Sequence, residues 1–161
     1  MWSHYSNSHR GLCIGFETII DHNSLCIKAD DPILNNHKDS IYHGPLSINK
    51  VKYQSNCPEP YDFILSDANH LYEFFKTKNV DWQYEKERRI IMPYKDINKR
   101  LIRFEKSALK EVIFGCKASA EFKQQLFKLI KDEYTSKSCN VDILQCSVDR
   151  NEYRLNIIEM H

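Results

Sequence analysis

A helix with one apolar face, running from Ser119 to about Tyr134, constrains the fold more than any other segment. Ser119 is a favourable N-cap residue, because its hydroxyl can accept a hydrogen bond from the first helical turn. The apolar residues after it follow the i, i+4, i+7, i+8 spacing of a buried stripe: Phe122, Leu126, Leu129 and Ile130. Such a helix must cover another apolar surface, so it is predicted to pack on a sheet as a structural support.

Short apolar runs bounded by turn-forming residues supply the strands of that sheet. They predict strands over residues 11–16, 25–29, 48–53, 84–92, 101–104, 112–115, 141–148 and 152–158. The last two are joined by Asp149-Arg150-Asn151 into a predicted C-terminal β-hairpin. The sequence therefore predicts an α+β fold, with a mostly antiparallel sheet flanked by two or three helices.

A shorter helix and a long loop complete the predicted organisation. Ser66 is expected to cap a helix that ends near Lys76. Its predicted buried stripe consists of Leu71, Phe74 and Phe75. The residues 30–44 carry several turn-forming pairs and are predicted to form a loop.

The composition agrees with a single domain over residues 1–161. With 42% hydrophobic residues, 161 residues can bury a core, which argues against disorder over most of the length. The net charge of +1 gives no overall attraction to nucleic acid or membranes. Six cysteines without a C-x-x-C pair are typical of reduced thiols. Without a signal peptide or membrane-length apolar run, the sequence predicts a soluble, cytoplasmic protein.

The first candidate ligand-binding cluster opens the chain. Trp2 and Tyr5 can stack on a planar ring. His4 and His9 can donate to a hydroxyl or a phosphate. The alternative interpretation is a packed N-terminal edge. A metal site made of His4, His9 and Cys13 matches no standard zinc spacing, so no metal is predicted.

The second candidate cluster lies between residues 82 and 89. On an extended strand, Glu85, Glu87 and Arg89 would share one face, with the carboxylates on Cα atoms roughly 6–7 Å apart. Such a row can orient a sugar hydroxyl, stabilise an oxocarbenium-like centre or bind a divalent cation. Arg89 should keep Glu87 ionised, which makes Glu87 the candidate catalytic carboxylate, with Tyr84 beside it. A cross-strand ladder of salt bridges is the alternative.

Positive charge is concentrated after this cluster. From residue 86 to residue 110 the chain has nine Lys or Arg residues against three Asp or Glu residues. This stretch could contact the phosphates of a nucleic acid through Arg88, Arg89, Lys99, Arg100 and Arg103. The alternative is a solvated strand face followed by a turn.

Three motifs together resemble an uncharacterised bacterial family, known as domain of unknown function 2971. They are Trp2-Ser3-His4-Tyr5-x-x-x-His9-x-Gly11-Leu12-Cys13-Ile14-x-Phe16, Lys78-x-x-x-Trp82-x-Tyr84-Glu85-x-Glu87-x-Arg89 and Val112-Ile113-Phe114-Gly115. The resemblance implies a bacterial or phage-associated cytosolic protein. Family members usually carry an upstream segment, with a Tyr-rich start and an Asn-Asp-Pro-type motif. The chain is therefore expected to be the C-terminal part of such a domain, or a shortened member.

A wider comparison suggests a function. A histidine in the first element, an aromatic residue and a glutamate on a later strand resemble the His–Tyr–Glu plan of ADP-ribosyltransferases, which grip NAD in a split antiparallel sheet. The comparison implies His4 on the adenosine-side ribose, Tyr5 or Tyr84 on the nicotinamide ring, and Glu87 on the ribose at the breaking bond. We therefore expect a nucleotide-handling domain of the NAD or ADP-ribose type, in which the two clusters converge.

Two alternatives stay open. One is a nucleic-acid-acting defence protein, resembling a metal-dependent nuclease, that would use Glu85 and Glu87 with the basic stretch. The other is a non-catalytic module whose clusters recognise a nucleotide or a partner protein. The three hypotheses predict different ligands. Binding of NAD or ADP-ribose supports the nucleotide-handling domain, and a salt-sensitive interaction with nucleic acid supports the defence protein. Binding of neither supports the non-catalytic module.

Overall fold

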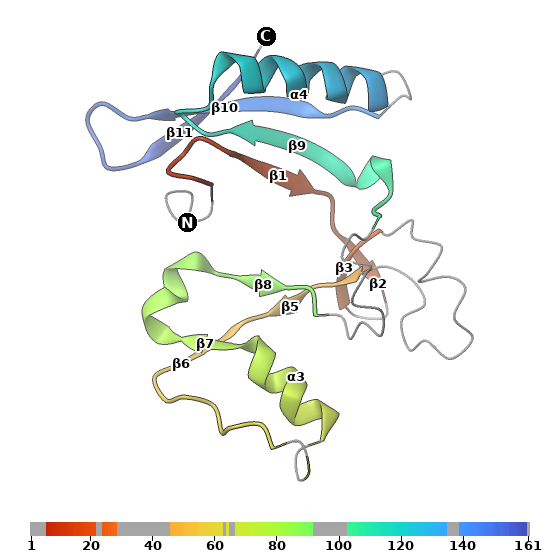
Figure 1. Ribbon diagram of the computed structural model, residues 1–161, viewed down its shortest axis with the longest axis vertical. Helices are drawn as coiled ribbons and strands as arrows, with labels where there is room; N and C mark the ends of the chain where they lie inside the picture. The colour runs from red at the N-terminus through yellow and green to blue at the C-terminus, as the bar shows by residue number, and fades with distance from the viewer. Residues whose placement is uncertain are drawn as a thin grey trace. The chain divides into compact units, whose positions relative to one another are not determined.

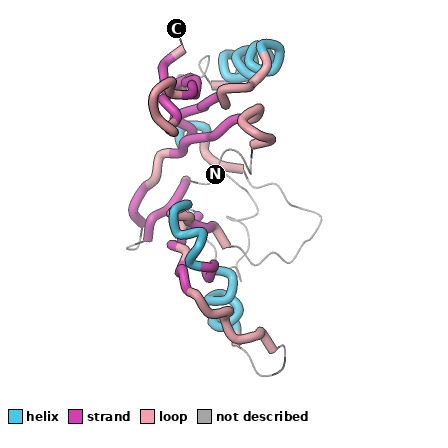
Figure 2. Tube along the Cα trace, turned by 90° about the vertical axis from the view of Figure 1, so that its left-hand side faces the viewer, coloured by secondary structure: helices cyan, strands magenta, loops and turns pink. Residues whose placement is uncertain are grey.

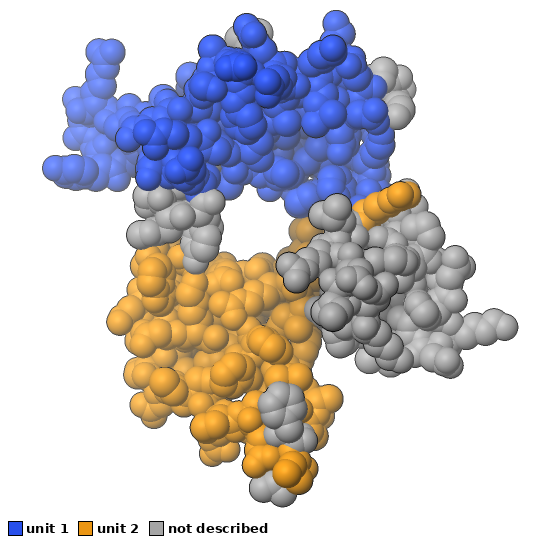
Figure 3. Space-filling model, viewed as in Figure 1, with its two compact units in different colours: residues 1–17, 104–161 blue, residues 18–103 orange. Residues whose placement is uncertain are grey.

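The computed structural model describes residues 6–21, 24–28, 46–62, 64, 67–91, 103–134 and 139–160. The chain divides into two compact units (Figure 3). Unit 1 combines residues 1–17 with residues 104–161, and unit 2 comprises residues 18–103. Helices and largely antiparallel strand pairs occur together, which confirms the predicted α+β class.

Unit 1 is built on a four-stranded sheet in the order β1-β9-β10-β11 (Figure 1). Its strands are β1 (Leu12–Phe16), β9 (Leu109–Phe114), β10 (Asp142–Val148) and β11 (Leu155–Glu159). β1 runs antiparallel to β9, and β10 runs antiparallel to β11. β9 and β10 are parallel, so the chain must cross over between them. The helix α4 (Ala120–Glu133) supplies that crossover.

Helix α4 lies along one face of this sheet (Figure 2). As predicted, Ser119 caps it, and the Ser119 side chain accepts a hydrogen bond from the backbone N–H of Phe122. Ile130 is buried and packs with Leu109 and Val112 of β9. The helix therefore has the supporting role that its apolar periodicity indicates.

The predicted stripe of α4 is wrong at one position. Leu129 is 53% exposed, whereas Phe127 has its ring 5.9 Å from the ring of the fully buried Phe114. Two residues two positions apart on a helix lie about 200° apart, so Leu129 and Phe127 cannot share a face. The buried face is therefore turned toward Phe127, away from Leu129.

The predicted C-terminal hairpin is confirmed. β10 and β11 pair with Leu144 opposite Glu159 and Val148 opposite Leu155. In the turn between them, Asp149 Oδ1 accepts hydrogen bonds from the backbone N–H groups of residues 151 and 152. The second strand begins at Leu155, three residues after the predicted start.

Over its described residues, unit 2 contains short paired strands, one α-helix and one 3-10 helix. A three-stranded antiparallel sheet consists of β2 (Ile19–Asp21), β3 (Ser24–Ile27) and β4 (Leu46–Ser47). The remaining strands are β5 (Asn49–Lys50), β6 (Lys52–Gln54), β7 (Thr77–Asn79) and β8 (Arg88–Arg89). β5 pairs antiparallel with β8, and β6 pairs parallel with β7. The strand predicted over residues 48–53 is therefore divided at the buried Val51.

Helix α3 (Ala68–Lys76) forms where a helix was predicted, but its apolar stripe is not buried. Asp67 caps it by accepting from the N–H of His70, whereas the predicted cap, Ser66, lies outside the described residues. Phe74 and Phe75 are 38% and 49% exposed. The described strands of unit 2 have only two to four residues each, and no residue of α3 is fully buried.

The strand predicted over residues 84–92 is mostly wrong. Val80–Glu85 forms a 3-10 helix, η1, whose cap Asn79 accepts from the N–H of Asp81. Lys86 follows in the left-handed region with φ 48°, and only the β8 residues Arg88–Arg89 are extended and paired. An Asx cap at residue 79 begins a helical turn, which the alternating charges do not reveal.

Some predicted segments fall wholly or partly outside the described residues. These are the last residue of the strand over residues 25–29, the loop over residues 30–44, the end of the strand after residue 91, and the start of the strand over residues 101–104. None of the described helices has the length and apolar character needed to cross a membrane.

Candidate functional site

Four charged side chains of unit 2 form one connected network: Lys78, Glu85, Glu87 and Arg89. The Lys78 ammonium donates to Oε2 of Glu85 and, at 2.9 Å, to Oε2 of Glu87. Arg89 Nε donates to Glu87 Oε1 at 2.7 Å, and Arg89 Nη2 donates to Glu87 Oε2 at 3.2 Å. Lys78 therefore joins the two carboxylates, and Arg89 closes the network at Glu87.

Strand pairing brings these residues together. Lys78 lies on β7 opposite Tyr53 of β6. The Tyr53 hydroxyl accepts a hydrogen bond of 2.7 Å from the backbone N–H of Glu87, which follows η1. Arg89 lies on β8, and its Nη1 donates to the carbonyl of Phe75 at the end of α3. The network therefore links β6, β7, β8 and α3.

Burial makes these charges dependent on one another. The side chain of Glu85 is 2% exposed and that of Lys78 is 16% exposed. Hydrogen bonds to Glu85 and then to Glu87 raise the pKa of Lys78 above its ordinary value. The Arg89 guanidinium, followed by Lys78, lowers the pKa of Glu87 to about 2 against the opposing effect of burial. Lys78 and Glu87 are therefore both charged at neutral pH.

One oxygen atom of the network lacks a hydrogen-bond donor among the described residues. Oε1 of Glu85 is buried and accepts no hydrogen bond from any described residue. A buried carboxylate oxygen without a donor is unfavourable, so Glu85 depends on its bond to Lys78.

Unit 2 is expected to lose stability in acid through Glu87. Folding lowers the pKa of this carboxyl, so its contribution is present above the ordinary pKa of 4.5 and is lost as pH falls toward about 2. The melting temperature of the wild type should fall over this range, and Glu87→Gln should flatten that fall. Circular dichroism melts at successive pH values measure it. Glu59→Gln, at an exposed glutamate of unit 2, is the control and should follow the wild type.

An exposed aromatic pair borders the network. The rings of Trp82 and Tyr84 have centroids 6.0 Å apart and are tilted by 33°. They are 37% and 62% exposed. The Lys78 ammonium lies 5.1 Å from the centroid of the Trp82 ring, a cation–π distance. The two rings can serve as a platform for a planar ligand next to fixed charges.

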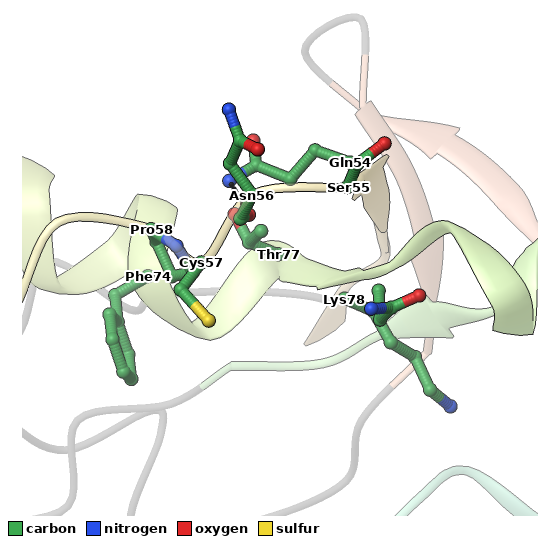
Figure 4. A pocket seen from close by; sticks show the side chains of 9 residues that line it. Gln54, Ser55, Asn56, Cys57, Pro58, Phe74, Thr77 and Lys78 are labelled. Atoms are coloured by element: carbon green, nitrogen blue, oxygen red, sulfur yellow. Dashed lines mark hydrogen bonds between the residues drawn. The ribbon is translucent and has the colours of Figure 1, made fainter.

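A pocket shares Lys78 with the network (Figure 4). Its volume is about 230 Å³, and residues 54–58 form one wall. Phe74, Thr77, Lys78 and Asn79 also line it. The Lys78 side chain extends away from Asn56 and Cys57 (Figure 4). The aliphatic part of the Lys78 side chain therefore lines the pocket, while its ammonium donates hydrogen bonds to Glu85 and Glu87.

The structure places only part of the first cluster. Trp2, His4 and Tyr5 lie outside the described residues, so the convergence of the two clusters stays a prediction. His9 belongs to unit 1 and has a φ of 67°. Its carbonyl accepts from the N–H of Lys117, and a Cβ on Gly115 would collide with that carbonyl.

The second cluster does come together, with a different geometry. Glu85, Glu87 and Arg89 were expected on one strand face, but they meet around Lys78 at the junction of η1 and β8. Lys78 was not predicted as a site residue. Its position in the motif Lys78-x-x-x-Trp82 was the one signal for it, because the contact itself depends on β6–β7 pairing.

The basic stretch and the metal interpretation can also be placed. Arg103 is exposed, whereas Lys99 and Arg100 lie outside the described residues. Between Glu85 and Glu87, the position that a divalent cation would take is occupied by the Lys78 ammonium. Over the described ranges, no three His, Cys, Asp or Glu side chains are grouped so that they could hold a metal ion.

Comparison with known proteins gives one match. A family model with the description "Protein of unknown function (DUF2971)" matches residues 1–90. This range includes the first two of the three motifs and all four residues of the charged network. No curated protein and no solved structure matches the chain.

Proposed function

The chain belongs to the DUF2971 family of proteins of unknown function, and we propose from its own residues that it binds a nucleotide of the NAD or ADP-ribose type. The observation that carries the proposal is the exposed pair Trp82 and Tyr84 beside the ionised Glu87. Aromatic faces hold nucleobase and nicotinamide rings by stacking, and ionised carboxylates accept hydrogen bonds from ribose hydroxyls.

Glu87 keeps some capacity for a ligand. A carboxylate has about four acceptor sites, and Lys78 and Arg89 occupy three of those of Glu87. Its side chain is 27% exposed. The remaining acceptor site on Oε1 suits a ribose hydroxyl that approaches from the solvent side.

The pKa values define what chemistry this site supports. A group that transfers protons at neutral pH needs a pKa near 7, and Glu87 and Lys78 are both shifted away from it. An ionised carboxylate can still stabilise positive charge that develops on a ribose. In the catalytic form of the proposal, Glu87 has this electrostatic role in ADP-ribosyl transfer. Tyr84 would then contact the nicotinamide.

A non-catalytic nucleotide-binding module is the second candidate. It is favoured by the cations around Glu87, because three of the roughly four acceptor sites of this carboxylate already accept hydrogen bonds from Lys78 and Arg89. The two candidates share the binding site and differ in turnover. Incubation with NAD, followed by chromatography for free nicotinamide, distinguishes them.

Glu87→Gln is expected to weaken NAD or ADP-ribose binding by about tenfold or more, because a hydrogen bond to a charged group contributes about 1.5–3 kcal/mol. Tyr84→Ala should weaken it similarly through lost stacking. Isothermal titration calorimetry measures both. Tyr153→Ala, at an exposed tyrosine of unit 1, is the control and should bind as the wild type does.

A different result for Glu87→Gln would assign this residue a structural role. Glutamine preserves the shape of the side chain, so a variant that melts at a lower temperature but binds normally would make Glu87 a structural residue. A wild type that binds neither NAD nor ADP-ribose would overturn the proposal itself.

A further inference from the structure

One face of the ribbon formed by β5 and β8 is exposed and positively charged. Their register places Lys50 directly opposite Arg88, and Asn49 opposite Arg89. The pairing continues with a hydrogen bond of 3.2 Å from the N–H of Val51 to the carbonyl of Glu87. Side chains alternate between the two faces of extended chain, so Lys50 and Arg88 share a face.

Between Lys50 and Lys52 the exposure of the side chains follows the same alternation, because both are exposed on either side of the buried Val51. Lys86, whose backbone is left-handed and not extended, and Arg88 are both exposed beside the half-buried Glu87. We call the four exposed residues Lys50, Lys52, Lys86 and Arg88 the cationic face.

The cationic face carries a repulsion that the described part of the chain does not relieve. Like charges directly opposite each other on neighbouring strands are destabilising. Among the described residues, none of these four side chains has an ion pair or a hydrogen bond. In contrast, the nearby cations Lys78 and Arg89 are both paired with carboxylates.

Lys86 shows a further unfavourable feature at the same place. Its φ of 48° lies in the left-handed region, which a residue with a side chain seldom adopts. Glycine or asparagine would take this conformation with less strain. A lysine here holds a charge beside Arg88 at a conformational cost, which is typical of positions kept for function.

We propose that the cationic face binds the phosphate backbone of a single-stranded nucleic acid. Lys50 and Lys52 are two residues apart along extended chain, a spacing of about 6–7 Å, and this suits successive phosphates of one strand. Tyr84, 62% exposed, lies two residues before Lys86, and an aromatic ring beside a cationic track can stack on an unpaired base. A duplex offers no unpaired base to that ring.

This inference goes beyond the nucleotide site. It shares Tyr84 with that site, but its four cations lie outside the charged network. Loss of phosphate binding and loss of NAD binding can therefore be measured separately on the same variants.

Fluorescence anisotropy with a labelled oligothymidylate of about 20 nucleotides tests the proposal. Wild-type affinity should fall steeply between about 50 and about 200 mM salt. The double variant Lys50→Ala/Arg88→Ala should bind about tenfold or more weakly at low salt. Its slope of log affinity against log salt should be shallower by about 1.4, since each lost contact to single-stranded phosphates changes it by about 0.7.

The control has the same change in charge at a different surface. Lys128→Ala/Lys131→Ala removes two exposed lysines of α4 in unit 1 and should bind the oligonucleotide as the wild type does. The Lys50→Ala/Arg88→Ala variant should melt at the same or a higher temperature, because the substitutions relieve repulsion. Its binding of NAD should be unchanged.

Three results would overturn the proposal. The first is a wild type that does not bind the oligonucleotide at low salt. The second is an equal loss of affinity in the α4 control, which would indicate an effect of net charge alone. The third is a duplex of the same length that binds as tightly as the single strand.

Discussion

Lys78→Met is expected to destabilise the protein by about 3–5 kcal/mol, because it removes one partner of a buried ion pair. The loss of stability arises at Glu85. Its side chain is 2% exposed, its Oε2 accepts from Lys78, and its Oε1 has no donor among the described residues. Methionine leaves this carboxylate buried and without a counter-charge.

Urea unfolding measures this effect in unit 2. The sequence has two tryptophans, so a Trp2→Phe background leaves Trp82, next to the network, as the fluorescence reporter. A second variant, Lys78→Met/Glu85→Leu, removes both charges and should recover much of the lost stability, since no orphaned charge remains. A loss of less than about 1 kcal/mol in the single variant would show that water reaches Glu85 in solution.

Phe114→Ala is expected to destabilise the protein by about 3–5 kcal/mol through the core of unit 1. Phe114 has no exposed surface, and the centroid of its ring lies 6.1 Å from that of Phe122 and 5.9 Å from that of Phe127. Alanine would leave a cavity between β9 and α4. The fall in the urea midpoint, followed by circular dichroism, measures the loss.

Leu129→Ala is the matched control for that substitution. It also removes a large apolar side chain, but Leu129 is 53% exposed, so the change in unfolding free energy should stay within about 0.5 kcal/mol. Equal losses for the two variants would contradict the register in which α4 lies on the sheet.

Unit 1 could be predicted well because its signals are strong and local. The helix after Ser119 has a cap and a repeated apolar spacing, β9 ends in the apolar run Val112-Ile113-Phe114, and β10 has ordinary strand length. The exposed stripe of α3 shows the limit of that method. Periodicity identifies the apolar side of a helix, but whether another element covers that side depends on distant parts of the chain.

The candidate site was predictable only in part, for a related reason. Glu87 and Arg89 are two residues apart, so their pairing follows from local sequence. Lys78 reaches Glu87 only because β7 lies beside β6. The opposition of Lys50 and Arg88 likewise depends on the register of two strands about forty residues apart in sequence. The charge pattern of either strand does not predict a register of this kind.

The discontinuity of unit 1 has a consequence for how the chain is synthesised and folds. Phe16 of β1 pairs with Leu109 of β9, so about ninety residues leave the ribosome before β1 meets its partner. In contrast, every described strand of unit 2 pairs within unit 2, which can therefore form first. Closing so long a loop costs entropy and delays the completion of unit 1. In the folded protein, however, Phe16 and Leu109 at the two ends of this loop form a cross-strand pair about 5 Å apart. An ordinary two-residue β-turn would span that distance.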